Sequence, residues 1–142
     1  MILLDTDHFS IQKYPQTARC QTLLARLQKS GDTEIGTTII TAEEEIRGWM
    51  AVIAKERQVP RQVLGYRDLL DLLKFLAEWT FTPFDERAAE EFERLRRVGT
   101  RRLAAQDLKI ASIALTRNAL LLSANLRDFR QVPGLRVENW ME

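Results

Sequence analysis

The chain has 142 residues, of which 45% are hydrophobic and 29% charged, and its formal net charge is +1. This composition, without repeats or low-complexity stretches, predicts a single folded domain over residues 1–142 and excludes a disordered or fibrous protein. The single cysteine, Cys20, excludes an internal disulfide and a cysteine-based zinc site, and the near-neutral charge does not by itself indicate a nucleic-acid-binding protein.

The first third of the chain alternates between strand and helix patterns. The opening MILLDTDHFS begins as a short buried strand over residues 1–5. It has neither the basic start of a secretory signal nor a membrane-spanning run, so we expect a cytoplasmic protein. A helix follows through residues 23–27 and ends at Ser30 and Gly31, and the threonine- and isoleucine-rich residues 34–40 predict a second strand.

The middle of the chain predicts a pair of helices. Apolar residues at helical spacing indicate a helix from residue 42 to about 57, and Pro60 separates it from a second helix through residues 69–76. Residues 79–84 alternate aromatic side chains with threonine and proline and predict a short strand, and a helix capped by Asp85 follows to about residue 97.

The last third continues the alternation. It predicts a helix over residues 104–117, a strand over residues 119–123 and a final strand near residues 135–137. Apolar strands that alternate with helices indicate an α/β protein, a three-layer α/β/α arrangement with a central, mainly parallel sheet of about five short strands. Ligands bind such sheets at the carboxyl ends of the strands.

Two acids are placed to meet at that edge. Asp5 ends the first strand and precedes a turn-forming Thr-Asp, so we expect its side chain at the carboxyl edge. Asp107 shares the core-facing stripe of its helix with Ile110 and Ala114, and a buried carboxylate needs a cation, a hydrogen-bond donor or a cavity mouth. Alternatives stay open: Asp5 or Asp7 can cap the next helix, and Asp107 can accept free backbone N–H groups.

A third acid lies in the run Glu43, Glu44 and Glu45 at the start of a helix, where acids favour the helix dipole whatever their function. Glu44 shares a stripe of small residues with Thr41 and Gly48. A glycine inside a helix costs about 1 kcal/mol relative to alanine, so Gly48 hints at close packing that would draw Glu44 inward. A solvated Glu44, with Glu43 or Glu45 facing inward, is the alternative.

Carboxylates that converge on one edge repel each other unless a divalent cation neutralises them. Oxygen ligands without a cysteine or histidine cluster favour Mg²⁺ or Mn²⁺ over zinc. A cation held in this way can activate water and stabilise the charge that develops on a phosphate during in-line displacement. The sequence shows no nucleophile with an evident base, no glycine-rich phosphate loop and no zinc-binding helix motif for a competing chemistry.

The remaining singled-out residues have mainly structural interpretations. The single histidine, His8, could contact substrate, but a lone histidine is more often structural, and the three tryptophans are typical packing residues. Five arginines fall within nine positions and form either a solvated helix face or a phosphate-contacting edge. They are Arg94, Arg96, Arg97, Arg101 and Arg102.

Four segments, in this order and spacing, resemble the PIN domain, and specifically the toxin ribonucleases of bacterial VapBC toxin-antitoxin pairs: MILLDTD, TTIITAEEEIRGW, QDLKIASIAL and LLLSANLRDF. In the second segment the family's threonine, glutamate and glycine match Thr41, Glu44 and Gly48. The resemblance implies that Asp5, Glu44 and Asp107 are the catalytic acids that bind Mg²⁺ or Mn²⁺. It also implies that a polar group of the fourth segment completes the site.

The fourth segment departs from the family pattern, because Asn125 occupies a position that is often an acid. Ser123 and Asn125 are expected to position water or metal, Thr6 to support the site, and Asp128 could substitute as the acid. The alternative is that Asn125 and Asp128 simply form a turn.

The resemblance further implies RNA as substrate, a homodimer, and a cognate antitoxin that occludes the acidic site. The helical pair at about residues 42–78 would form the clip against which the antitoxin packs. Two other functions stay open. One is a non-catalytic RNA-binding or protein-interaction module whose arginines contact phosphates in a salt-sensitive way. The other is a structure-specific DNA nuclease that uses the same acids.

Overall fold

The computed structural model describes residues 1–100 and 102–142 and contains a five-stranded sheet with the strand order β3-β2-β1-β4-β5. All neighbouring strands are parallel. The strands are β1 (Ile2–Leu4), β2 (Ile35–Thr38), β3 (Phe81–Thr82), β4 (Leu120–Leu122) and β5 (Arg136–Glu138). The predicted α/β architecture with about five short parallel strands is confirmed.

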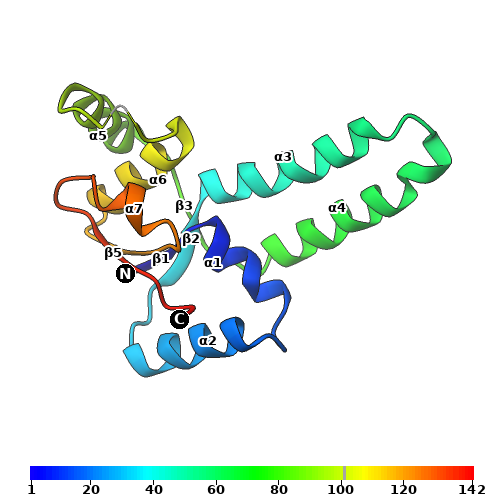
Figure 1. Ribbon diagram of the computed structural model, residues 1–142, viewed down its shortest axis with the longest axis horizontal. Coiled ribbons are helices and arrows are strands. Elements are labelled where there is room, and N and C mark those ends of the chain that lie inside the picture. Colours follow the sequence, from blue (N-terminus) through cyan, green and yellow to red (C-terminus); the bar gives the residue numbers. More distant parts are fainter. Residues whose placement is uncertain (101) are drawn as a thin grey trace.

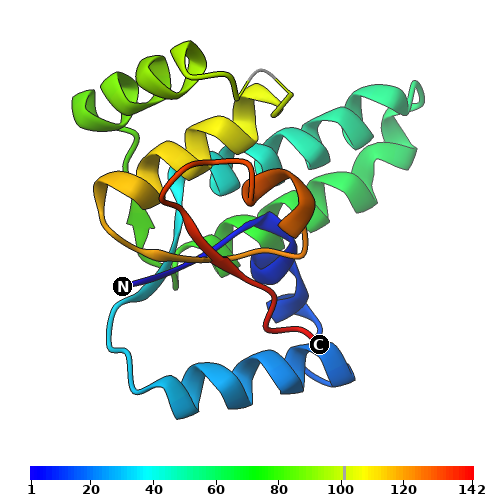
Figure 2. The same cartoon turned by 60° about the vertical axis from the view of Figure 1, so that its left-hand side comes forward.

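Helices cover both faces of this sheet, as Figures 1 and 2 show. The helices are α1 (Thr6–Ser10), α2 (Ala18–Ser30), α3 (Ile39–Lys55), α4 (Val63–Leu76), α5 (Glu86–Arg97), α6 (Ala105–Thr116) and α7 (Leu126–Phe129), and the 3-10 turns are η1 (Ile11–Lys13) and η2 (Val59–Gln62). None of the helices among the described residues is long and apolar enough to cross a membrane.

The side chains of β1 divide the core into two halves, because successive residues of a strand point to opposite faces. Leu3 packs into a cluster with apolar residues of α5 and α6, whereas Ile2 and Leu4 pack with residues of α1, α2 and α4. Both faces of the central strand are therefore buried, which explains why it reads as a continuous apolar run rather than an alternating one.

One predicted boundary is wrong, because the strand expected over residues 34–40 ends at Thr38. The Thr38 side chain accepts a hydrogen bond from the backbone N–H of Thr41 and caps α3, so Ile39 and Ile40 form the first turn of the helix. A capping threonine at the end of a strand thus overrides the β propensity of the two isoleucines after it. As predicted, Asp85 caps α5 by accepting from the backbone N–H of Ala88.

The helices α3 and α4 form an arm that projects from the body of the molecule in Figure 1. Several large apolar side chains of this arm are exposed to solvent. They are Met50, Val52, Val59, Val63, Leu64, Tyr66, Leu70 and Leu73.

At the carboxyl edge of the sheet, β1 leads into α1 and β2 leads directly into α3. The edge is therefore bordered by the ends of strands and by the first turns of the helices that follow them. The amino end of α6 lies beside α3, since Gln106 in the first turn of α6 donates a hydrogen bond to Glu43 of α3. The predicted site residues lie on these elements and on the residues that follow β1 and β4.

Candidate active site

Asp5 follows β1 directly, and its carboxylate has two hydrogen-bond donors. The backbone N–H of Thr6 donates to Oδ1 at 2.8 Å, so Asp5 does cap α1. The buried hydroxyl of Ser123, at the end of β4, donates to Oδ2 at 2.7 Å. The capping alternative and a site at the sheet edge are therefore both compatible with the position of this side chain.

Asp5 is only 6% exposed. Burial raises its pKa from 3.8 to about 7, with further increases from the negative charges of Asp7 and Asp107. The hydrogen bonds from Ser123 and Thr6 act in the opposite direction, because they stabilise the ionised form. In the metal-free protein, Asp5 thus keeps its proton to a much higher pH than an exposed aspartate does.

Asp107 lies in the first turn of α6 and is half-buried, although Ile110 and Ala114 on its stripe are fully buried. Among the described residues, its carboxylate accepts no hydrogen bond and joins no ion pair, and it caps no backbone N–H. Burial raises the pKa of Asp107, followed by the charges of Asp128 and Asp7. Asp107 is thus held near Asp128 and Asp7, with no compensating donor within residues 1–100 and 102–142.

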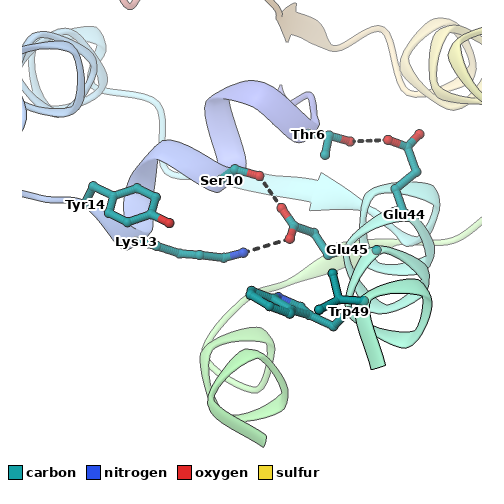
Figure 3. A pocket seen from close by; sticks show the side chains of 9 residues that line it. Thr6, Ser10, Lys13, Tyr14, Glu44, Glu45 and Trp49 are labelled. Atoms are coloured by element: carbon teal, nitrogen blue, oxygen red, sulfur yellow. Dashed lines mark hydrogen bonds and ion pairs between the residues drawn. The ribbon is translucent and has the colours of Figure 1, made fainter. Parts of the chain in front are cut away.

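Glu44 lies on α3 and accepts a hydrogen bond from the Thr6 hydroxyl at 2.9 Å, as Figure 3 shows. The Thr6 hydroxyl also lies 3.2 Å from that of Thr41. Burial raises the pKa of Glu44, the Thr6 hydrogen bond opposes this increase, and the charge of Asp107 adds to it. The Glu44 and Asp107 carboxylates are therefore close enough to repel each other.

The two flanking glutamates point elsewhere. Glu43 accepts hydrogen bonds from Gln106 and Arg47, and Glu45 accepts from Ser10 and pairs with Lys13. Figure 3 shows the Glu45 contacts beside the Thr6 to Glu44 bond. Of the three acids in the run, Glu44 is therefore the one that bonds to Thr6, and the charge of Asp107 contributes to its raised pKa.

Gly48 corrects the reason given for the position of Glu44. A Cβ atom added at Gly48 would meet no heavy atom within 4 Å, so the predicted close packing at this glycine is wrong. Gly48 instead lines a hollow of about 470 Å³ that Thr6 and Glu44 border at one end and Trp49 at the other. Glu44 faces inward because it bonds to Thr6, not because its stripe is tightly packed.

The fourth segment contributes a small network at the start of α7. The backbone N–H of Asn125 donates to the Ser123 hydroxyl at 3.0 Å, and the Asn125 side-chain amide donates to Asp128 Oδ2 at 3.0 Å. The charge of Asp128 contributes to the raised pKa of Asp107. Ser123 is thus tied to Asp5, whereas Asn125 holds Asp128 on the side of Asp107.

Asp7 is the residue that sequence reasoning missed. Its Oδ1 accepts the backbone N–H of His8 in the first turns of α1, in line with the capping alternative. Its Oδ2 also accepts the backbone N–H of Ala124 at 2.9 Å, and its charge raises the pKa of both Asp5 and Asp107. The available signal was its position two residues after a strand-ending acid. That signal is weak, because a polar residue at the start of a helix is common for capping alone.

The comparisons with known proteins agree with this geometry. A family model described as PIN domain matches residues 2–135. The chain belongs to the PIN domain family. This confirms the resemblance inferred from the four sequence segments.

Relatives of this PIN domain include Ribonuclease VapC2 of Rickettsia felis, which is 26% identical over 140 residues, covering 97% of this chain and 96% of the relative. The crystal structure of VapBC2 from Rickettsia felis, bound to a DNA fragment from its promoter, has 24% identity, a TM-score of 0.71 and 99% coverage of both chains. VapBC-1 from nontypeable Haemophilus influenzae has a TM-score of 0.74 at 18% identity and covers all of both chains.

The donor chemistry of this PIN domain fits a partly hydrated hard cation. No three histidine, cysteine, aspartate or glutamate side chains within residues 1–100 and 102–142 gather closely enough to enclose an ion by themselves. Mg²⁺ does not need such a cage, because it keeps several waters and binds through one or two carboxylates and substrate phosphates. Asp5, Glu44 and Asp107 offer oxygen ligands whose raised pKa values show that each would gain from nearby positive charge.

Two of the four arginines of α5 pair with acids of the same helix. Arg94 pairs with Glu91, and Arg96 pairs with Glu93 at 3.8 Å. These pairs have the i, i+3 spacing of an exposed helix face, which favours the solvated interpretation. Arg101 of the predicted cluster lies outside the described residues.

Proposed function

We propose that this PIN domain, residues 1–142, is a metal-dependent endoribonuclease that hydrolyses RNA phosphodiester bonds as the toxin of a type II toxin-antitoxin pair. The observation that carries the proposal is the set of Asp5, Glu44 and Asp107 at one sheet edge. Burial and at least one further acid raise the pKa of each of them. RNA as the substrate is supported by a relative named a ribonuclease, which aligns with this chain over nearly its whole length.

We assign these three acids to hold Mg²⁺ or Mn²⁺. When bound, the cation supplies positive charge that activates water and stabilises the charge developing on the scissile phosphate. Ser123 and the Thr6 N–H orient the Asp5 carboxylate, and the Thr6 hydroxyl orients Glu44. The reaction joins a water oxygen to phosphorus, breaks one bridging P–O bond and leaves a proton on the departing oxygen.

Asn125 and Asp128 are assigned a supporting role. The Asn125 amide donates to the Asp128 carboxylate, whose charge acts on Asp107. Asp128 therefore adds negative charge on the Asp107 side of the site, which strengthens attraction for a cation. Replacing Asp128 with Asn tests this assignment, because it should weaken Mn²⁺ binding without removing Asp5, Glu44 or Asp107.

The test is RNA cleavage by the purified protein with Mg²⁺, with Mn²⁺ and with a chelator. We expect chelation to stop cleavage, and Asp5→Asn, Asp107→Asn and Glu44→Gln to reduce it to background while the proteins stay folded. Glu43→Gln is the matched control, because Glu43 is the neighbouring acid but contacts Gln106 and Arg47 instead. Full metal-dependent cleavage by Asp5→Asn or Asp107→Asn would refute the assignment.

Two other outcomes would identify the alternative functions. RNA binding without cleavage, weakened by salt but indifferent to Mg²⁺, would indicate a non-catalytic module. Metal-dependent cleavage of structured DNA in preference to RNA would indicate a DNA nuclease.

We further propose that the α3–α4 arm binds a cognate antitoxin and that the protein forms a homodimer. Exposed apolar side chains concentrated on one projecting element mark a surface for a partner protein. Co-purification with the product of an adjacent small reading frame tests the antitoxin, and light scattering tests the dimer. Leu64→Lys on the arm should abolish co-purification, whereas Val98→Lys, at another exposed apolar residue after α5, should not.

A further inference from the structure

The single histidine of the chain is fully buried, and both of its ring nitrogens are engaged. Nε2 of His8 lies 3.1 Å from the backbone N–H of Trp140, which donates to it. Nδ1 lies 2.5 Å from Oδ1 of Asp7, which also accepts the backbone N–H of His8. Because Nε2 accepts a hydrogen bond, it carries no proton in the neutral ring. The ring proton is therefore on Nδ1, which donates a hydrogen bond to the Asp7 carboxylate.

The other carboxylate oxygen of Asp7 contacts the residues that follow β4. Its Oδ2 accepts the Ala124 N–H at 2.9 Å and lies 3.4 Å from the hydroxyl of Ser123. That hydroxyl has one hydrogen and two nearby carboxylates, and it lies closer to Asp5, at 2.7 Å. With His8 and Ala124 already donating to Asp7, the Ser123 hydrogen is free to serve Asp5.

Trp140, whose backbone N–H donates to His8, is held in place by contacts of its own. The indole N–H of Trp140 donates to Glu138 at 2.6 Å, and the guanidinium of Arg26 lies 5.3 Å from the centre of the Trp140 ring. Arg26 also donates to the backbone carbonyls of Asn139 and Glu142. The segment after β5 is thereby held against α2, and its Trp140 N–H is presented to His8.

We propose that His8 is a positioning residue of the acidic edge: its Nδ1–H holds Asp7, so that the Ser123 hydroxyl donates to Asp5 and fixes the orientation of that carboxylate. This inference rests on the proposed function, because the orientation matters only if Asp5 binds a cation. Groups that orient a metal ligand through a hydrogen bond commonly change metal affinity by about 10- to 100-fold when removed. His8 acts one step further away, through Asp7 and Ser123.

Loss of stability alone does not test this role, because any buried histidine with two partners stabilises the fold. Two amide substitutions separate the partners. The amide of Asn reaches about as far along the side chain as Nδ1, and the amide of Gln about as far as Nε2. Both variants keep the bond from the backbone N–H of residue 8 to Asp7. The side chain of His8→Asn can also donate to Asp7, whereas the side chain of His8→Gln keeps only the bond from the Trp140 N–H.

The measurement is Mn²⁺ affinity of the metal-free full chain by calorimetry. We expect His8→Gln to weaken binding by about tenfold or more, and His8→Asn to restore it to within about threefold of the wild type. Leu23→Ala, in the apolar core beside α1, is the matched control for destabilisation and should lower the melting temperature with unchanged affinity. Equal affinities for both His8 variants, or an equal loss in Leu23→Ala, would overturn the proposal.

A second measurement needs no metal. Because the chain has one histidine, its imidazole nitrogen signals in an NMR spectrum come from His8 alone. We expect the neutral ring with its proton on Nδ1, and a proton on Nε2 would overturn the proposal. A wild type that binds no Mn²⁺ and cuts no RNA would refute the proposed function itself, whatever the ring's tautomer. Normal Mn²⁺ binding and cleavage with unaffected His8 variants would refute only the positioning role.

Discussion

Replacing Asp5 with Asn should stabilise the metal-free protein at pH 8 and leave it almost unchanged at pH 4. The folded state raises the pKa of Asp5 from 3.8 to about 7, so between these values the native carboxyl stays protonated while the unfolded one ionises. Ionisation of the unfolded chain favours unfolding, so stability falls as pH rises through this window. Below it both states are protonated, and above it the full penalty persists.

A shift of about three pKa units corresponds to roughly 4 kcal/mol, since one unit is about 1.4 kcal/mol. Asn carries no charge and removes this penalty. Its side-chain oxygen can still accept the Thr6 N–H at the start of α1, and its amide can donate to the Ser123 hydroxyl that now donates to Asp5. For a chain of this length, 4 kcal/mol raises the melting temperature by roughly 10 °C.

The assay is thermal unfolding of the wild type and Asp5→Asn in a chelator at pH 8 and pH 4. Asp32→Asn is the control of opposite sign, because the backbone N–H of Glu34 and the amino terminus lower the pKa of that exposed carboxyl. A gain in Asp5→Asn that is the same at both pH values, or absent at pH 8, would refute the reasoning. Saturating Mg²⁺ at pH 8 should stabilise the wild type and not the variant.

Three further predictions concern the same edge. Thr6→Val removes the hydroxyl that donates to Glu44 and should weaken Mn²⁺ affinity about tenfold by calorimetry, whereas Thr22→Val on α2 should not. Gly48→Ala should raise the free energy of unfolding in urea by about 1 kcal/mol, because its Cβ meets no atom within 4 Å. Mn²⁺ affinity of the wild type should fall by up to about tenfold per pH unit below pH 7, because the cation displaces the proton of Asp5. A Mn²⁺ affinity that does not change from pH 5 to 8 would contradict this third prediction.

The sequence predicted the order and type of the main elements because their signals are local. A buried apolar run ending at an acid gave β1, and Asp85 before an amphipathic stretch gave the start of α5. The boundary between β2 and α3 was missed because Ile39 and Ile40 have β propensity, and only the Thr38 side chain on the Thr41 N–H marks the helix start. Propensity is a weaker influence than a satisfied cap.

The site also has residues that local patterns predict and one residue, Asp7, that they do not. Asp5, Glu44 and Asp107 were expected at one edge because parallel strands share a carboxyl end and helical spacing assigns faces. The role of Asp7 was not predictable, because it depends on the Ala124 N–H and the His8 ring. The first contact joins residues 117 positions apart, which no local pattern indicates. The second joins neighbouring side chains of the short helix α1, and helical periodicity does not predict a contact between adjacent residues.

The three consecutive glutamates of α3 differ in whether a basic side chain of the protein neutralises them. Glu43 has Arg47 as its partner and Glu45 has Lys13, so each flanking acid is neutralised within the fold. Glu44 has a neutral hydroxyl instead, from Thr6. Across the described residues, Asp5 and Asp107 likewise pair with no lysine or arginine. Within this part of the chain their charge is balanced by protons, which the raised pKa values reflect, or by a cation from solution, and the two compete for the same oxygens.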